Sequence, residues 1–429
     1  MSTPGMRDIL RLLCLCGCLR ASHAQGQAVA TYNYWPNPVS HTNSDTWLRQ
    51  HHTEIAMLKP RVLVLVADNR AHIGAVQAFV KQAVQAAAEG SRYHGYSVPA
   101  SKPQLQYQIV SLADLRDQSA TAWPSIWPVH IDPQGKPAFD YDGLFSPEMA
   151  RALGFHDPGD PDKYLNLREL FEQGVINEVW MVYPEIDGQP ENGIVGIFET
   201  AARVQVYDAQ GNPKPHIFDR CAGNGCLPPT EHGQAHVTMR FAELNIGLGV
   251  GCFTHATGHG FDTGLWRAIP EFDDASARFF NRRLKAQGLP MDNLYESCPS
   301  KLGDCWEYPN DHTLANGPLS KPLPSFRDDH WGMGCGSVHF PPNGHSNYDF
   351  EDTQRVLSTC ENYGLQNGPD GADKQQPYRF TGMPADPRKP YDCGGAWQIY
   401  LRQSFPGYGS KAKNADGTPM KSWWPYLYY

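Results

Sequence analysis

Hydrophobic and polar positions follow two different periods in the first part of the chain. The run RVLVLVAD at residues 61–68 is almost continuously apolar and rich in β-branched side chains, which is typical of a strand buried on both faces. In the next segment, residues 71–90, apolar side chains recur at helical spacing and a glycine stands at the end. These positions are Ile73, Val76, Phe79, Val80, Val84 and Ala87, with Gly90 last. The pattern predicts a buried strand followed by an amphipathic helix.

The same order of elements returns further along. Residues 106–115 are a second candidate strand, and NLRELFEQGVI followed by NEVWMVYPEI indicates a helix, a tight turn and a strand ending near residue 186. Alternating strands and helices favour an α/β fold with a parallel or mixed sheet flanked by helices. Ligands of such sheets bind at the carboxyl ends of strands. The residues there are Asp68, Asn69, Arg70, Glu185 and Asp187, and each also suits a turn or a helix cap.

The second half has a different composition. From about residue 216 the chain is dominated by glycine, proline, histidine, tryptophan and tyrosine. We therefore expect an α/β half at 25–215 and a loop-rich, disulfide-stapled half at 216–429, continuous with each other as one large domain. The chain ends in KSWWPYLYY, which is unusually aromatic for a terminus. Packing of this end into the core is the expected outcome, and a platform that stacks on sugar rings is the alternative.

The first two dozen residues have the features of a signal peptide. Arg7 and Arg11 precede the apolar stretch LLCLCGCL, and small residues stand at the cleavage spacing before Gln25. We expect residues 1–24 to be removed and the mature protein to be secreted or periplasmic. The string LCGC, ending at Cys18, fits a bacterial lipidation box loosely, so a lipoprotein is the alternative. No later stretch is apolar enough to predict a transmembrane helix.

Cysteine usage agrees with export. Of the 11 cysteines, eight lie beyond the predicted signal peptide, and an even set in an oxidising compartment favours disulfides over metal thiolates. Two close pairs, Cys221 with Cys226 and Cys298 with Cys305, can each close a short loop. The formal net charge is −9, with acidic and basic residues well mixed, so no basic face for nucleic acid is expected.

The strongest candidate for chemistry is GCFTHATGHGFDTG. On a helix, His255, His259 and Asp262 share one face, so the two imidazoles could hold one ion, with Asp262 as a further ligand or as a partner that orients a histidine. Zinc is the metal that such a set favours. Two observations count against it. A chain with this many histidines contains roughly 0.6 pairs four residues apart by chance alone, so one such pair is weak evidence for a metal site. The several glycines of the segment would each destabilise a helix by about 1 kcal/mol.

A third ligand has to come from a distant segment, and CGSVHFPPNGHSNYDFED offers His339. Val338 and Phe340 flank it in what we expect to be a short strand-like run, and two prolines follow. His345, Asp349, Glu351 and Asp352 come next, within expected reach of the same site. For the carboxylate that would accept a proton from water, the candidates are Glu199, just ahead of a predicted strand, and Glu185, at the end of another.

Together these features predict a secreted hydrolase that depends on one divalent metal, zinc, and acts on an extracellular polymer, with peptide or amide bonds ahead of glycosidic ones. The sequence has no G-x-S-x-G nucleophile motif and no HExxH motif. Two alternatives remain open. One is a metal-free carbohydrate-active enzyme that uses the acids of HSNYDFED and aromatic side chains, and the other is a non-catalytic binding protein of the envelope.

Overall fold

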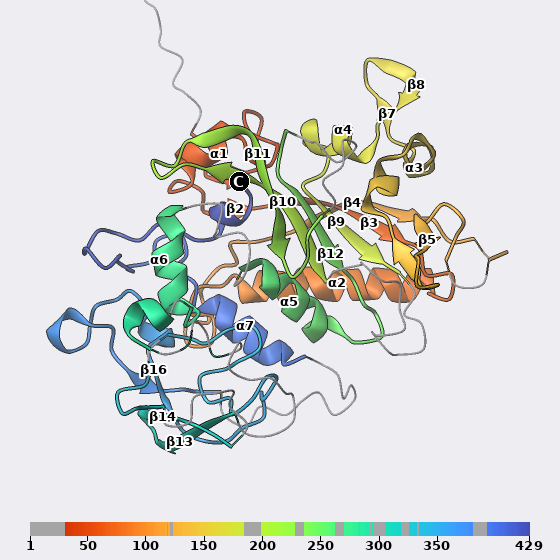
Figure 1. Ribbon diagram of the computed structural model, residues 1–429. Coiled ribbons are helices and arrows are strands. Elements are labelled where there is room, and N and C mark those ends of the chain that lie inside the picture. The colour runs from red at the N-terminus through yellow and green to blue at the C-terminus, as the bar shows by residue number, and fades with distance from the viewer. Residues whose placement is uncertain are drawn as a thin grey trace, which may run out of the picture. The chain divides into compact units, whose positions relative to one another are not determined.

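A mixed six-stranded sheet organises the fold (Figure 1). The computed structural model describes residues 31–117, 119–120, 123–183, 199–227, 236–261, 270–282, 284–289, 291, 294, 305–318, 326–332, 334–380 and 393–429. Within this part of the chain, Asn33–Tyr429 belongs to one compact unit. In spatial order the strands of the sheet are β11 (Pro213–Gly223), β10 (Thr200–Tyr207), β12 (Met239–Glu243), β9 (Glu178–Val182), β3 (Arg61–Val66) and β4 (Gln108–Asp114).

The strand directions make the sheet mixed. β3 pairs in parallel with β4 and β9, and β9 pairs in parallel with β12. β10 runs antiparallel to both β12 and β11. The direction therefore reverses between β12 and β10, and the start of β10 lies beside the carboxyl end of β12.

β3 is an interior strand, as its sequence predicts. Its residues Val62 to Val66 are all 0% exposed. Val62, Val64 and Val66 face one hydrophobic cluster, whereas Leu63 and Leu65 face another. Each such side chain contributes about 1.5–3 kcal/mol on burial, so this one strand supplies much of the hydrophobic stabilisation on both faces of the sheet.

Helices cover both faces of the sheet. On one face, α2 (Ile73–Gly90) and α5 (Val250–His259) pack against the valines of β3, and α7 (Gly395–Gln403) packs on both helices. On the other face lie α3 (Pro147–Leu153) and α4 (Leu167–Glu172). α4 begins at a capping box formed by Asn166 and Glu169. The expected α/β architecture with a flanked mixed sheet is confirmed.

Short elements complete the described part of the chain. A three-stranded sheet has the order β13 (Trp306–Asn310), β14 (Thr313–Asn316), β15 (Arg327–Asp328), and α6 spans Pro270–Phe279. The remaining helix and paired strands are α1 (Thr46–His51), β1 (Tyr34–Trp35) with β2 (Met57–Leu58), β5 (Val129–Ile131) with β6 (Pro137–Phe139), β7 (His156–Asp157) with β8 (Asp160–Tyr164), and β16 (Leu357–Ser358) with β17 (Gln376–Pro377). The loop-rich character expected for 216–429 stays a prediction. No helix in the described ranges is long and apolar enough to cross a membrane.

The aromatic carboxyl-terminal segment is part of the core. Trp423 is 0% exposed, Trp424 1%, Tyr426 2% and Tyr429 3%. The Tyr428 hydroxyl donates to the Tyr107 hydroxyl at 3.0 Å, which ties the segment to residues just ahead of β4. The expected packing of this end is confirmed, and its rings are not free to stack on a sugar.

Three disulfides are formed in the described part of the chain, which fits the export expected from the sequence. They join Cys221 to Cys226, Cys252 to Cys393, and Cys335 to Cys360. The first confirms one of the two predicted close pairs. Cys305 is also disulfide-bonded, and its predicted partner Cys298 lies outside the described residues. The predicted signal peptide lies outside them as well.

Alkylation of the denatured, unreduced mature protein should add no mass, because we expect the eight cysteines beyond residue 24 to be completely paired in an oxidising compartment. Intact-mass measurement, with and without iodoacetamide, gives both the number of free thiols and the start of the chain, expected near Gln25. A reduced sample should take up eight adducts and serves as the control. Two or more adducts on the unreduced protein would contradict a complete set of disulfides.

Candidate metal centre

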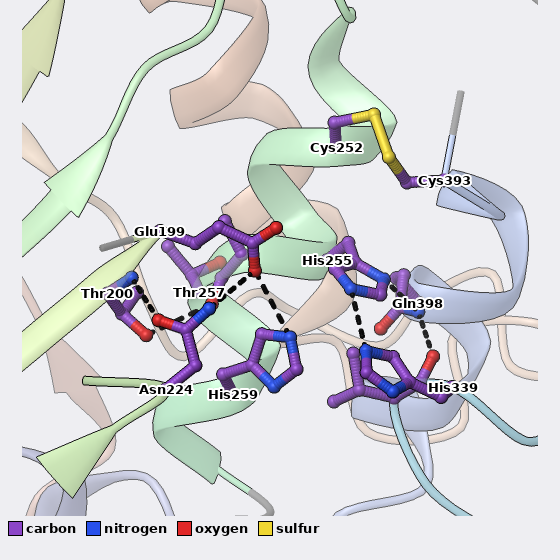
Figure 2. A network of polar contacts seen from close by, with 12 residues as sticks. Glu199, Thr200, Asn224, Cys252, His255, Thr257, His259, His339, Cys393 and Gln398 are labelled. Carbon is purple, nitrogen blue, oxygen red and sulfur yellow. Dashed lines mark hydrogen bonds and ion pairs between the residues drawn. A yellow bond between two sulfur atoms is a disulfide. The ribbon is translucent and has the colours of Figure 1, made fainter. Parts of the chain in front are cut away.

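Three imidazoles from distant segments converge beside the sheet (Figure 2). His255 and His259 lie one turn apart on α5, and His339 reaches them from a loop more than eighty residues further along. One nitrogen of each ring lies within 4.8 Å of the others. Among the described residues, this is the one group of three or more His, Cys, Asp or Glu side chains placed so that they could share an ion.

α5 forms in spite of its glycines, and one of them, Gly258, allows neighbouring segments to pack closely against the helix. A β-carbon at Gly258 would lie 2.9 Å from Cγ2 of Val338 and 3.3 Å from Oε1 of Gln398. Any larger residue would push away the segment that carries His339. The glycine that counts against a helix in the sequence therefore lets the third imidazole reach the other two.

The segment that carries His339 is a tight turn, so the expected strand-like run is wrong. Ser337 N–H donates to the Phe340 carbonyl at 2.8 Å, and Phe340 N–H donates to the Ser337 carbonyl at 3.2 Å. Gly336 has a φ of +86°, and a β-carbon there would collide with the Phe340 carbonyl. The chain reverses here because Gly336 adopts a left-handed backbone conformation. The alternating apolar and polar residues around His339 do not indicate this turn.

The spacing of the His255 and His339 nitrogens fits a metal ion. Nε2 of His339 lies 3.2 Å from Nε2 of His255. Two nitrogens bound to one tetrahedral zinc, each at about 2.0–2.1 Å, stand about 3.3 Å apart. The His255 and His339 rings are nearly parallel, with centroids 4.9 Å apart, and the His259 ring stands almost perpendicular to both. The His259 ring thus meets the other two edge to face.

Burial favours the neutral form of the His255 imidazole. It is 1% exposed, and this burial lowers its pKa well below the usual value. The neighbouring His259, His339 and Arg402 lower the pKa further, whereas a hydrogen bond to the backbone of Cys393 acts in the opposite direction. A ring N–H engaged with the backbone leaves the other nitrogen with its lone pair, which is the state that a metal requires.

Side chains of α7 hold α5 and the segment that carries His339 in place. Gln398 donates from Nε2 to the Val338 carbonyl at 2.7 Å, and the same atom lies 3.5 Å from Nδ1 of His255 (Figure 2). Arg402 donates to the Thr257 hydroxyl of α5 at 2.7 Å. The Cys252–Cys393 disulfide joins α5 to the residues just before α7. Such outer partners restrict the motion of metal ligands.

The predicted proton acceptor Glu199 lies at the site. Its Oε2 is 3.1 Å from Nε2 of His259, and Asn224 donates to the same oxygen at 2.9 Å (Figure 2). The Glu199 carbonyl accepts from the N–H of Glu243 at the carboxyl end of β12. The Glu199 side chain is 38% exposed, so solvent reaches a carboxylate that is fixed beside a candidate ligand.

The other sequence candidates lie elsewhere or outside the described residues. Glu185, Asp187 and Asp262 lie outside the described residues. Asp68 and Asn69 are turn residues, since Asp68 caps the Arg70 N–H and Asn69 bridges to residues 117 and 120. They take no part in the histidine cluster.

His345 and its acidic neighbours form a separate network, contrary to the expectation that they reach the same site. Nδ1 of His345 contacts the Trp306 carbonyl at 2.9 Å, and Nε2 contacts Oε1 of Gln354 at 3.1 Å and Oδ2 of Asp352 at 3.4 Å. Asp349 accepts from the His345 N–H at 2.9 Å. These contacts hold the loop after the two prolines to β13. Glu351 is exposed.

Sequence reasoning missed Tyr348. Its hydroxyl lies 3.0 Å from Nε2 of His339, and its ring is stacked near that of His255 at a centroid distance of 5.3 Å. A single tyrosine in a loop gives no local signal of such a role. Its placement depends on the left-handed backbone at residue 348, where φ is +66°, and on the turn at His339.

The chain was compared with protein-family models, with curated proteins and with solved structures. None of the three comparisons found a match. The chemistry of the site itself therefore carries the functional argument. Two buried imidazoles and one partly buried one, a partly exposed carboxylate and a phenolic hydroxyl can together bind a divalent ion, accept a proton and donate a hydrogen bond.

Proposed function

We propose that the protein is an exported hydrolase that holds one zinc ion with His255, His259 and His339 and cleaves peptide or amide bonds of an extracellular polymer. The observation that carries the proposal is the convergence of these three imidazoles within 4.8 Å, two of them on one helix and buried. Imidazole ligands in this number favour zinc among the divalent metals of proteins.

The composition of the cluster supports a catalytic site over a structural one. Structural zinc sites are closed by four protein ligands and commonly use thiolates, whereas catalytic sites use three and keep a position for water or substrate. Here the nearest described cysteines, Cys252 and Cys393, are joined in a disulfide and do not compete as ligands. Zinc supplies the acidity that brings bound water to a pKa of about 7.

Glu199 is the proposed proton acceptor. A general base must stand near the water that it deprotonates and must itself be reachable. The Glu199 carboxylate is beside His259, receives a hydrogen bond from Asn224 and is 38% exposed. Both of these contacts are made by Oε2 of Glu199, and we propose that the other oxygen takes the proton. Glu185 remains a sequence candidate for the same role.

The exported location and the substrate class belong to the proposal. Disulfides and the sequence features of a signal peptide support a secreted or periplasmic protein. The carbohydrate alternative loses part of its basis, because the aromatic end that would stack on sugars is buried in the core. We therefore place peptide and amide bonds ahead of glycosidic bonds.

Hydrolysis of a denatured protein such as casein, or of a fluorogenic peptide pool, tests the proposal. Activity should be lost after chelation and return with one equivalent of zinc. Glu199→Gln should keep the zinc and lower the rate about 10²- to 10⁴-fold, the range expected when a general base is removed.

Glu54→Gln is a matched control, because Glu54 also pairs with a histidine, at 3.0 Å from His51, but at an exposed position. It should hydrolyse like the parent. A parent protein that holds zinc and cleaves no peptide, or that cleaves peptides equally well without metal, would contradict the proposed function.

A further inference from the structure

The Tyr348 hydroxyl lies among the candidate ligand atoms themselves. Its distance to Nε2 of His339 is 3.0 Å, and that nitrogen is the one that lies 3.2 Å from Nε2 of His255. The hydroxyl therefore faces the side of the imidazoles that would bind an ion, and not their outer edges.

This position is fixed by several contacts. The Tyr348 N–H donates to the His339 carbonyl at 3.0 Å, so the two residues move together. The ring lies nearly parallel to that of His255, at an interplanar angle of 21°, and its centroid is 4.4 Å from that of His339. The backbone of Tyr348 has a φ of +66°. Residues other than glycine rarely adopt this conformation, and those that do are often found at functional sites.

A metal ion changes what this hydroxyl can do. When Nε2 of His339 binds zinc, its lone pair is used and it no longer accepts a hydrogen bond. The phenolic proton must then be donated to another acceptor. In a tetrahedral site the fourth ligand atom stands about 3.3 Å from each nitrogen, so an oxygen in that position would lie within hydrogen-bonding reach of the hydroxyl.

We propose that Tyr348 is a catalytic hydrogen-bond donor, which stabilises the carbonyl oxygen of a scissile amide or ester as negative charge develops on it. The inference rests on the proposed zinc hydrolase and narrows its substrate class. Amide and ester hydrolysis passes through an oxyanion that such a donor stabilises. Glycoside hydrolysis passes through a cation-like state and gains nothing from the same donor.

Tyr348→Phe tests this role, because it removes the hydroxyl and retains the ring that stacks on His255. The variant should keep one zinc per chain and a KM within about threefold of the parent, while kcat on a peptide falls about 10²- to 10³-fold, the loss typical for one oxyanion donor. The binding of acetohydroxamate, a small zinc ligand with a carbonyl oxygen, should weaken at least tenfold in a calorimetric titration.

Tyr308→Phe is the matched control. Its hydroxyl donates to the Gly344 carbonyl at 3.0 Å in the same loop, and its ring contacts His345, not the histidine cluster. It should lower the melting temperature without changing kcat or acetohydroxamate affinity.

The two proposals fail in different ways. A parent that binds no zinc, or that binds zinc without cleaving peptides, overturns both. A zinc-loaded, active parent whose Tyr348→Phe variant keeps its kcat overturns the role of Tyr348 alone. Loss of zinc from Tyr348→Phe, with full kcat restored by excess zinc, would show that the residue positions a ligand and does not act on the substrate.

Discussion

Replacing any one of His255, His259 and His339 by alanine should reduce the zinc content of the purified protein from one ion per chain to nearly none. Two imidazoles hold zinc poorly, and the affinity should fall by well over 100-fold, since loss of an outer partner alone costs about 10- to 100-fold. The measurement is metal content by mass spectrometry after chelation and reconstitution with one equivalent of zinc.

The control must separate lost coordination from lost stability. His345→Ala suits this purpose for a structural reason: its imidazole contacts the Trp306 carbonyl and Gln354, so its removal should destabilise the loop that follows the two prolines. We expect His345→Ala to melt earlier than the parent and still to bind one zinc.

Melting curves of all four variants, recorded without metal, complete the test. A zinc-free parent that gains no thermal stability from zinc, manganese or calcium would end the metal hypothesis. Equal loss of zinc from His345→Ala and the three cluster variants would show that the metal content reports only on folding.

The elements that the sequence predicts well are those whose burial is encoded locally. β3 is an unbroken apolar run, and α2 repeats apolar residues at helical spacing, so each pattern indicates its environment without knowledge of the rest of the fold. β11 is an edge strand whose residues from Pro213 to Ile217 are all exposed, and it has no comparable apolar pattern. Sequence periodicity cannot identify such a strand.

The candidate site was only partly predictable for a related reason. His255 and His259 are visible because their spacing on one helix is local. His339 and Glu199 could be named as candidates, but their approach depends on the turn at Gly336 and on the reversal of strand direction at β10. The contacts of Tyr348 and Gln398 with His255, and the Cys252–Cys393 disulfide, join segments far apart in the chain, and no local pattern encodes them.

Leu65→Asp should remove most of the free energy of unfolding. Leu65 is 0% exposed, lies in an interior strand between Met181 of β9 and Ala113 of β4, and packs in the cluster that α3 and α4 cover. A carboxylate there has no partner, and an unpaired buried charge costs about 3–5 kcal/mol in addition to the lost apolar contacts. Since whole domains are stable by about 5–15 kcal/mol, a large part of the protein should be unfolded or degraded in the cell that produces it.

Two further variants show which part of the loss comes from charge. Leu65→Asn has nearly the same shape as Leu65→Asp but no charge and should lie between it and the parent in urea unfolding. Val110→Asp, on the neighbouring edge strand β4 and 41% exposed, should change the stability by less than about 1 kcal/mol. Burial raises the pKa of a carboxyl group in the folded state, so the deficit of Leu65→Asp relative to Leu65→Asn should be largest at high pH and shrink as the pH falls towards about 4, where the carboxyl group of the unfolded state is protonated as well. A Leu65→Asp protein that is exported and melts like the parent would show that β3 is not the core strand described above.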